Sequence, residues 1–251
     1  MSKKQSTSSK RQLMREQRQK KQRQQRVLFI SAVVIVVLGL AALIIIPSIQ
    51  NAAAPVGNIV EITPRSLPQA NGLSLGEPNA PVKVDVYEDF QCPICRNFTE
   101  QIEPQLVKND IATGKVYYTF HQFPFLDDRA PTNESHQAAN ASMCASEQGR
   151  FWDYHDMLFA NWTGENVGSF TDKRLAAFAE KLGLNMDQFN TCFKENKYQS
   201  QINADLAAGQ KAGVQGTPSI FVNGKIVEPV PGQVPTYTDI QAAIDNALTS
   251  K

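Results

Sequence analysis

The sequence is poor in the residues that bind metal ions. Its 251 residues include three histidines and four cysteines, and the histidines (His121, His136 and His155) follow no metal-binding spacing. Only two of the cysteines, Cys92 and Cys95, lie close together, whereas a structural zinc site usually needs a second cysteine or histidine pair at matching spacing. The sequence therefore disfavours a zinc-binding module, and we expect no metal ion at this pair.

Acidic residues are almost absent from the first 26 positions. Residues 1–26 contain ten Lys or Arg and one acidic residue, Glu16, so this tail has a net charge of +9. The rest of the chain contains 15 basic and 23 acidic residues, a net charge of −8. A basic tail can bind nucleic acid or set the orientation of a membrane segment, and the residues that follow it favour the second interpretation. We expect no nucleic-acid partner.

Charged residues are also missing from positions 27–46, where twenty mostly apolar residues follow one another. At a rise of about 1.5 Å per residue, a helix of this length spans the roughly 30 Å core of a bilayer. A cleaved signal peptide is the alternative, because residues 52–54 (Ala-Ala-Ala) could form a cleavage site, but its apolar region is usually shorter. We predict an uncleaved signal-anchor helix in the cell membrane, with the tail 1–26 in the cytoplasm and everything after Pro47 outside.

The residues after this helix predict a linker and one folded domain. Several prolines between Pro47 and Pro81 interrupt any regular element, and residues 47–72 are predicted to be an extracytoplasmic linker. Residues 73–251 are predicted to be the folded domain. Within it, residues from about 130 to 213 have the periodicity of helices and are predicted to be a helical insertion.

The most informative stretch, residues 82–98, combines a strand, a turn and a cysteine pair. Valines alternate with charged residues at its start, which is the pattern of a half-buried strand, and Cys-Pro-Ile-Cys follows. Pro93 is favoured at the first position of a helix, which puts Cys92 at the N-cap. There the free N–H groups and the helix dipole favour a thiolate, and Cys95 is close enough to form a disulfide. We interpret the pair as a redox site, with Cys92 exposed and Cys95 facing inward.

The remaining elements follow from the same periodicities. They are a helix at 93–109, a strand at 116–120, strands at 219–222 and 225–227, and a helix at 237–248. Asn223-Gly224 separates the last two strands and is the strongest short signal for a hairpin, because both residues tolerate positive φ. The order of elements is strand, helix, strand, helical block, hairpin and helix, and it predicts an α/β fold.

These motifs resemble the thioredoxin fold, and specifically the DsbA-like thiol:disulfide oxidoreductases. The most specific pieces are GEPNAPVKV before the first strand, DFQCPIC at the cysteine pair, EQGRFWDYHDMLF in the helical block and GVQGTPSIFVNG at the hairpin. The resemblance covers about residues 73–248 and implies that the helical insertion lies between the central strand and the hairpin. It also implies that Cys92 and Cys95 are the catalytic cysteines, and that Pro218 is held in the cis form.

Thr217 and Pro218 are predicted to bind substrate. The X–Pro bond is the main place where a cis peptide is tolerated, and a cis Pro218 would leave the backbone of Thr217 free to pair with an extended peptide. An ordinary turn proline is the alternative.

The sequence departs from the family at one position near the cysteines. Some DsbA-like proteins carry an acidic residue six positions before the first cysteine, where this chain has Val86. Glu88 lies on the same face of the predicted strand as Val86, whereas Asp85 and Asp89 do not. The group that takes the proton from Cys95 is therefore open at this point.

The other two cysteines, Cys144 and Cys192, each lie in a helical stretch of the predicted insertion. An exported chain reaches a compartment where disulfides persist, so we predict a structural disulfide between them. Two buried unpaired thiols are the alternative.

Together these observations predict a membrane-anchored, extracytoplasmic thiol:disulfide oxidoreductase that introduces disulfides into reduced exported proteins. A cysteine pair needs no organic cofactor for this exchange. The family resemblance implies reoxidation by a quinone-linked membrane partner of the DsbB or VKOR kind. A reductase or isomerase on the same fold and a metal-handling binding module are the alternatives.

Overall fold

The computed structural model describes residues 56–129, 132–228 and 234–250, together with nine residues between positions 23 and 39. The basic tail and the predicted membrane helix at 27–46 lie mostly outside the described residues. No helix formed by the described residues is long and apolar enough to cross a membrane. The chain divides into two units, 1–54 and 55–251, and the second unit contains every strand described below.

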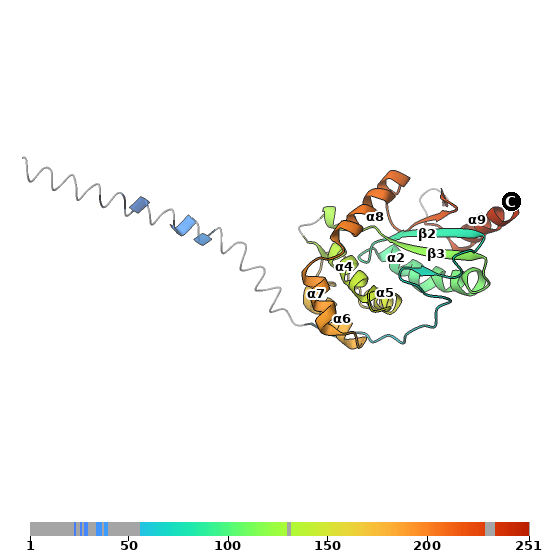
Figure 1. The fold of residues 1–251 in the computed structure, drawn as a ribbon. Helices are drawn as coiled ribbons and strands as arrows, with labels where there is room; N and C mark the ends of the chain where they lie inside the picture. The colour runs from blue at the N-terminus through green and yellow to red at the C-terminus, as the bar shows by residue number, and fades with distance from the viewer. Residues whose placement is uncertain are drawn as a thin grey trace, which may run out of the picture. The chain divides into compact units, whose positions relative to one another are not determined.

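A five-stranded mixed sheet forms the centre of the second unit (Figure 1). Its strands are β1 (Ser74–Leu75), β2 (Val82–Glu88), β3 (Val116–Gln122), β4 (Ser219–Val222) and β5 (Lys225–Ile226), in the spatial order β1-β3-β2-β4-β5. Strands β2 and β3 are parallel, and β4 is antiparallel to β2. Alternate residues of β2 and β3 are buried, as the period-two pattern predicted for β2, and β3 extends two residues beyond its predicted end at position 120.

A continuous helical run connects β2 to β3, as a parallel pair requires. It consists of α2 (Pro93–Asn97), the π-helix η1 (Phe98–Ile102), α3 (Glu103–Leu106) and the π-helix η2 (Val107–Ile111). Pro104 lies at the start of α3. A proline has no N–H to donate to the carbonyl four residues earlier and its ring clashes with that carbonyl, which explains the wider π-turn just before it.

The predicted helical insertion lies between β3 and β4. It begins with the short 3₁₀-helix η3 (Leu126–Arg129) and continues with α4 (Glu134–Ser146), α5 (Phe151–Ala160), α6 (Asp172–Lys181), α7 (Met186–Lys194) and α8 (Gln199–Ala212). Gly213 ends α8 in the left-handed conformation, at φ 94°. The thioredoxin-like fold with a helical insertion is therefore confirmed.

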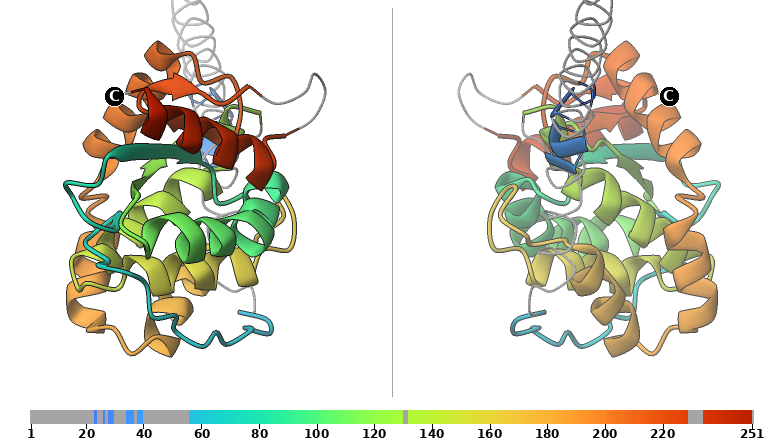
Figure 2. Two further views of the ribbon diagram at one scale, coloured as in Figure 1. Left: turned by 90° about the vertical axis from the view of Figure 1, so that its right-hand side faces the viewer. Right: turned by 90° about the vertical axis from the view of Figure 1, so that its left-hand side faces the viewer.

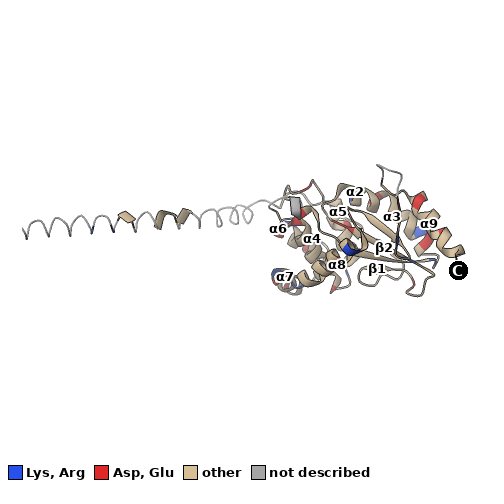
Figure 3. Ribbon diagram, turned by 90° about the horizontal axis from the view of Figure 1, so that it is seen from above, with Lys and Arg blue, Asp and Glu red and all other residues tan. Residues whose placement is uncertain are grey.

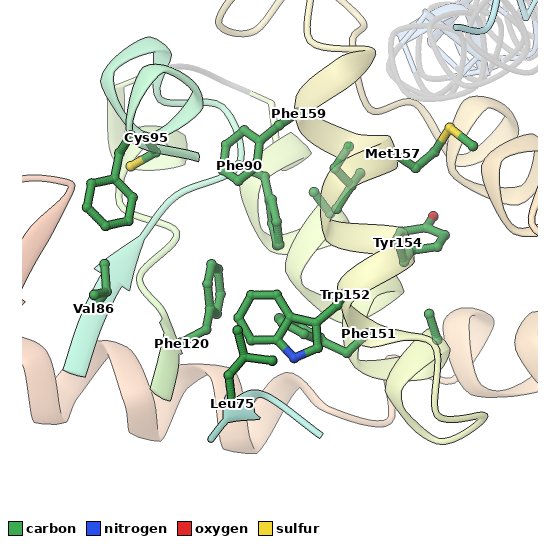
Figure 4. Packing of buried hydrophobic residues seen from close by; sticks show 14 of the residues in the cluster. Leu75, Val86, Phe90, Cys95, Phe120, Phe151, Trp152, Tyr154, Met157 and Phe159 are labelled. Carbon is green, nitrogen blue, oxygen red and sulfur yellow. The ribbon is translucent and has the colours of Figure 1, made fainter. Parts of the chain in front are cut away.

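The main hydrophobic core joins the sheet to the insertion. Phe90 and Phe120 stack with ring centroids 5.4 Å apart, and Phe159 packs against Phe90 at 5.2 Å. Phe151 and Trp152 extend this aromatic cluster along α5 (Figure 4). The aromatic residues of the insertion are thus core residues.

The opposite face of the sheet is covered by α8. Gly209 on this helix allows a close approach, because a Cβ atom there would lie 2.7 Å from the ring of Phe123. Phe123 also packs against Tyr87 of β2, with ring centroids 6.1 Å apart. The sheet is therefore enclosed on both faces beside the end of β2.

The last helix, α9 (Tyr237–Thr249), begins with a capping box formed by Thr236 and Asp239. It lies beside the end of the 93–111 run (Figure 2), where the hydroxyl of Tyr237 donates to Asp110 at 3.1 Å. This helix carries two acidic residues, Asp239 and Asp245, and no Lys or Arg, in keeping with the excess of acidic residues after position 26 (Figure 3).

The described part of the predicted linker, residues 56–72, packs against the helices of the insertion. Asn161, the C-cap residue of α5, holds the backbone of Val60 by hydrogen bonds of 2.8 and 2.9 Å. Arg65 forms two hydrogen bonds of 2.6 Å with Asp156 of α5. This segment has no strand or helix, because its pairing partners are side chains rather than another strand.

Candidate active site

Cys92 and Cys95 lie at the start of the helical run that follows β2. Cys92 is the N-cap of α2, with Pro93 at the first helical position, and its extended backbone (φ −76°, ψ 121°) matches the predicted placement. The N–H of Cys92 donates to the carbonyl of Asp89 at 2.9 Å, which fixes the turn between strand and helix. Both cysteines are free, so the structure represents the reduced, dithiol form.

Cys92 is far less accessible than the sequence predicted. Only 5% of its surface is exposed, because the loop before β4 covers the start of α2. The thiol of Cys92 donates to the carbonyl oxygen of Thr217 at 3.3 Å. The peptide bond between Thr217 and Pro218 is cis. The structure thus brings the cysteine pair and the Thr217-Pro218 loop together, and the expectation of an exposed Cys92 is wrong.

Cys92 is the acidic thiol of the pair, with its pKa lowered to about 6. The largest cause is a hydrogen bond from the thiol of Cys95, which together with the other donors outweighs the opposing effect of burial. The hydroxyl of Thr217 and the backbone N–H groups of Cys95 and Ile94 also lower the pKa. The helix-start N–H groups were predicted from the sequence, whereas the contributions of the Cys95 thiol and of Thr217 were not.

Cys95 has the opposite character. It is completely buried and belongs to the same hydrophobic core cluster as Val86 (Figure 4). Burial raises its pKa well above the ordinary value, and the neighbouring Cys92 and Glu88 raise it further. The arrangement therefore separates an ionisable Cys92 from a Cys95 that keeps its proton.

Glu88, the last residue of β2, is a fully buried acid beside Cys95. Burial raises its pKa well above the usual range, and the charges of Glu103 and Cys92 raise it further, while hydrogen bonds with Cys95 and Tyr118 act in the opposite direction. The hydroxyl of Tyr118 donates to Glu88 Oε1 at 3.5 Å. The sequence left open which group could take the proton from Cys95. The structure places an acidic side chain beside Cys95, that of Glu88, two positions after Val86.

Beyond Glu88 lies a second buried acid, Glu103 of α3, which the sequence did not reveal. Arg65 donates to Glu103 at 2.8 Å and also binds Asp156. The ring of His155 lies between Glu103 and Asp156. The only local signal was that Glu103 is a charged residue among the apolar residues of the predicted 93–109 helix. No local pattern connects Arg65 to it, because the two are 38 residues apart.

A separate polar network holds the turn before Cys92. The buried carboxylate of Asp89 accepts from the N–H of Gln91 at 2.9 Å and from Ser135 at 2.7 Å. The carbonyl of Gln91 accepts from the indole N–H of Trp162 at 2.7 Å. The insertion thus fixes the backbone that leads into the cysteine pair. Burial raises the pKa of Asp89 to about 7, against the effect of these hydrogen bonds.

Cys144 and Cys192 form a disulfide that joins α4 to α7. It lies within the helical insertion, and both residues are buried. Among the described residues, no group of three or more His, Cys, Asp or Glu side chains is arranged to hold a metal ion. His136 and His121 instead pair with Asp127 and Asp85, at 2.8 and 2.9 Å.

Comparison with known proteins agrees with this geometry. The thioredoxin family model matches residues 69–246. The probable disulfide bond formation protein D of Bacillus cereus is 30% identical over 177 residues, which cover 70% of this chain and 78% of that protein. Disulfide bond formation protein D of Bacillus subtilis is 28% identical, over 70% of this chain and 77% of that protein.

A solved structure shows the same fold. The crystal structure of oxidised BdbD from Bacillus subtilis superposes with a TM-score of 0.62 and 26% identity, and the match covers 77% of this chain and all of that chain. In this chain the fold carries a Cys-x-x-Cys pair at the start of the helix after β2. The chain therefore belongs to the thioredoxin family, as a DsbA-like thiol:disulfide oxidoreductase.

Proposed function

We propose that this oxidoreductase is a membrane-anchored, extracytoplasmic oxidase that transfers the Cys92–Cys95 disulfide to reduced exported proteins. One observation carries the direction of transfer: an ionisable Cys92 lies beside a buried Cys95 whose pKa is raised. A stabilised thiolate favours the reduced form of the pair, and a pair that prefers to be reduced is a good oxidant.

The exchange proceeds in two steps. In the oxidised enzyme, a substrate thiolate attacks Cys92 Sγ, so that the bond between Cys92 and Cys95 breaks and its electron pair stays on Cys95. A second substrate thiolate then attacks the substrate sulfur of the mixed disulfide and releases Cys92 as a thiolate. Two electrons pass from the substrate to the enzyme, and the substrate leaves with a disulfide. Catalysis is thus assigned to Cys92 and Cys95.

Thr217 and Pro218 are proposed to hold the substrate during this exchange. Thr217 lies directly before the cis proline, and its carbonyl oxygen is 3.3 Å from Cys92 Sγ. An extended peptide that pairs with the Thr217 backbone would therefore present its cysteine next to the attacked sulfur. Recognition through the backbone suits an enzyme that acts on many sequences.

The proposed location rests on the sequence. Residues 27–46 contain no charge and follow a strongly basic tail, so we propose a single-pass anchor with the tail in the cytoplasm. The proposed substrates follow from the names of the relatives, which are disulfide bond formation proteins. The proposed reoxidant is a quinone-linked membrane protein of the DsbB or VKOR kind.

A refolding assay tests the proposed direction. The oxidised full-length chain should restore activity to a reduced, disulfide-dependent substrate protein, and Cys92→Ser should abolish this effect. The reduction potential should lie between about −270 and about −120 mV, the values of thioredoxin and DsbA. A potential below that range, with no oxidation of the substrate, would instead identify a reductase on the same fold.

A further inference from the structure

Beneath the cysteines lies a buried polar cluster that the disulfide exchange alone does not explain. Glu88, Glu103, Tyr118 and His155 are completely enclosed, and each comes from a different element. Among the described residues, Glu88 Oε2, Glu103 Oε2 and His155 Nε2 have no hydrogen-bond partner. Buried polar atoms without partners are rare because each is costly, and they often mark a functional site.

The helical run places Glu103 in this cluster. Glu103 follows Cys95 by eight residues, and the π-turn η1 lies between them. A π-turn contains more residues than an α-turn and therefore rotates the chain less per residue. Both side chains are completely buried, and both affect the pKa of the Glu88 carboxyl, which Glu103 raises in addition to burial and which a hydrogen bond with Cys95 lowers.

The far side of the cluster leads toward the surface. Arg65, whose side chain is 31% exposed, donates to Glu103 Oε1 at 2.8 Å and to Asp156 Oδ1 at 2.6 Å. His155 Nδ1 lies 3.0 Å from Asp156, and its Nε2 lies 4.0 Å from Glu103 Oε2. Because the Asp156 carboxylate can only accept, Nδ1 carries the ring proton in the neutral tautomer, which leaves Nε2 as an acceptor facing Glu103.

We propose that Glu103, held in place by Arg65, passes protons between the buried Glu88 beside Cys95 and the solvent side of the cluster. This inference rests on the proposed Cys92–Cys95 exchange. Glu103 and Arg65 are positioning residues, since they act on the sulfur through Glu88. The N-terminal segment that carries Arg65 is thereby part of the redox machinery.

The proton balance of the step is simple. When the substrate attacks Cys92, Cys95 leaves as a thiolate and takes a proton from the carboxyl group of Glu88. Glu88 is then a buried carboxylate, and it regains a proton through Glu103 from water on the partly exposed Arg65 side of the cluster. Each reduction of the disulfide therefore takes up one proton, and reoxidation of Cys95 releases it by the same route.

The charges around the two acids set the pH at which this exchange operates. The titratable groups that face them are Cys92, Cys95, Tyr118, Arg65, His155 and Asp156. The negative charge of Glu103 raises the pKa of Glu88, after burial itself. Arg65 offsets the charge of Glu103, and contacts with Asp156 and Glu103 raise the pKa of Arg65 despite burial.

This arrangement predicts opposite effects for two neutral substitutions in the full-length protein. Glu103→Gln removes the negative charge beside Glu88, so the cluster should take up its proton at a pH lower by about one unit or more. Arg65→Gln removes the positive charge that offsets the Glu103 carboxylate, so the proton uptake should move to higher pH. Arg65→Lys keeps a positive charge there, so the pH of uptake should return toward the wild-type value. Glu100→Gln, an exposed change on the same helical run, is the control.

Two measurements test the prediction. The first is the rate at which dithiothreitol reduces the disulfide as a function of pH, and the second is the infrared absorption of protonated carboxyl groups during the same titration. Glu103→Gln should lower the rate at neutral pH about tenfold or more, as the loss of a proton donor does. Circular dichroism establishes that each variant is folded, and the two Arg65 variants test the inference on their own if Glu103→Gln does not fold.

The outcomes separate the inference from the function on which it rests. Shifts of opposite sign in the rate profile and in the infrared titration support the proton route. Unchanged profiles in the folded variants, or shifts in the same direction, overturn it. If the wild-type chain forms no mixed disulfide with any thiol, the proposed function itself is wrong, whatever the variants do.

Discussion

The Sγ atom of Cys92 lies 3.3 Å from the carbonyl oxygen of Thr217, although the two residues are 125 positions apart. This contact joins the start of α2 to the loop before β4, and it explains why Cys92 is nearly buried. It also places the hydroxyl of Thr217 where it lowers the pKa of both cysteines. The reactivity of the pair therefore depends on two distant parts of the chain.

The first prediction distinguishes the two cysteines of the pair. Cys95→Ser leaves Cys92 able to attack a substrate disulfide, but it removes the thiol that would release the product, so mixed disulfides should accumulate on Cys92. Cys92→Ser should abolish both activity and trapping, because Cys95 is completely buried. Non-reducing electrophoresis with mass spectrometry detects these adducts. Equal trapping by both variants would contradict the assignment.

The second prediction concerns the thiolate of Cys92. Its ionisation, followed by ultraviolet absorbance or by the rate of alkylation, should have a midpoint near pH 6 in the reduced protein. The unfolded value is about 8.5, so the thiolate stabilises the reduced protein fully above about pH 8.5, by about 3 kcal/mol. This stabilisation should be lost as the pH falls through 6, and the oxidised protein should show no such loss. A midpoint at the free-cysteine value would refute the prediction.

A third prediction concerns the Thr217 hydroxyl. Among the described residues it has no hydrogen-bond partner when Cys92 is protonated, so it is available to donate to the thiolate. Thr217→Val keeps the shape of the side chain and removes this donor, so it should raise the pKa of Cys92 and lower the reduction potential. Alkylation rates against pH measure the first effect. Thr249→Val, at the exposed end of α9, is the matched control and should change neither quantity.

The fourth prediction concerns the disulfide between Cys144 and Cys192. Replacing both residues with serine opens a loop of 48 residues, which should cost about 4 kcal/mol by the loop-entropy model. The melting temperature should fall by roughly 10 °C, while oxidation of a reduced substrate continues. Calorimetry and the refolding assay measure the two effects. A folded but inactive double variant would show that this disulfide takes part in exchange.

The fifth prediction concerns topology. If residues 27–46 anchor the chain with the basic tail inside, protease added to intact cells should remove the folded domain. Protease should reach the tail only after the membrane is opened. Complete protection of the domain in sealed membranes would overturn the proposed location.

Local sequence determined most of the secondary structure. Pro93 fixed the start of α2 and made Cys92 its N-cap, as observed. Asn223 and Gly224 adopt positive φ values of 48° and 76° between β4 and β5, so the hairpin is where the sequence placed it. These features are set within a few residues along the chain, where proline geometry and turn preferences act.

Local sequence did not determine how the N-terminal segment packs. The prolines around residues 56–72 indicated a linker, yet Arg65 is held by a side chain of α5 and Val60 by the C-cap residue of this helix. Proline prevents a helix or an internal strand, but it does not prevent an extended segment from binding to polar side chains. The partners, Asn161 and Asp156, are about 90 to 100 residues away, and no sequence motif links them to this segment.

The sequence by itself thus determined the redox pair, the elements that carry it and the family to which the chain belongs. Only the tertiary structure decided the burial of Cys92, the effect of the Glu103 charge on the pKa of Glu88 and the contact of Arg65 with both Glu103 and Asp156. The physical reason is that a pKa depends on desolvation and on charges a few ångströms away. Those neighbours come from β2, α3, α5 and the N-terminal segment, which meet only when the chain folds.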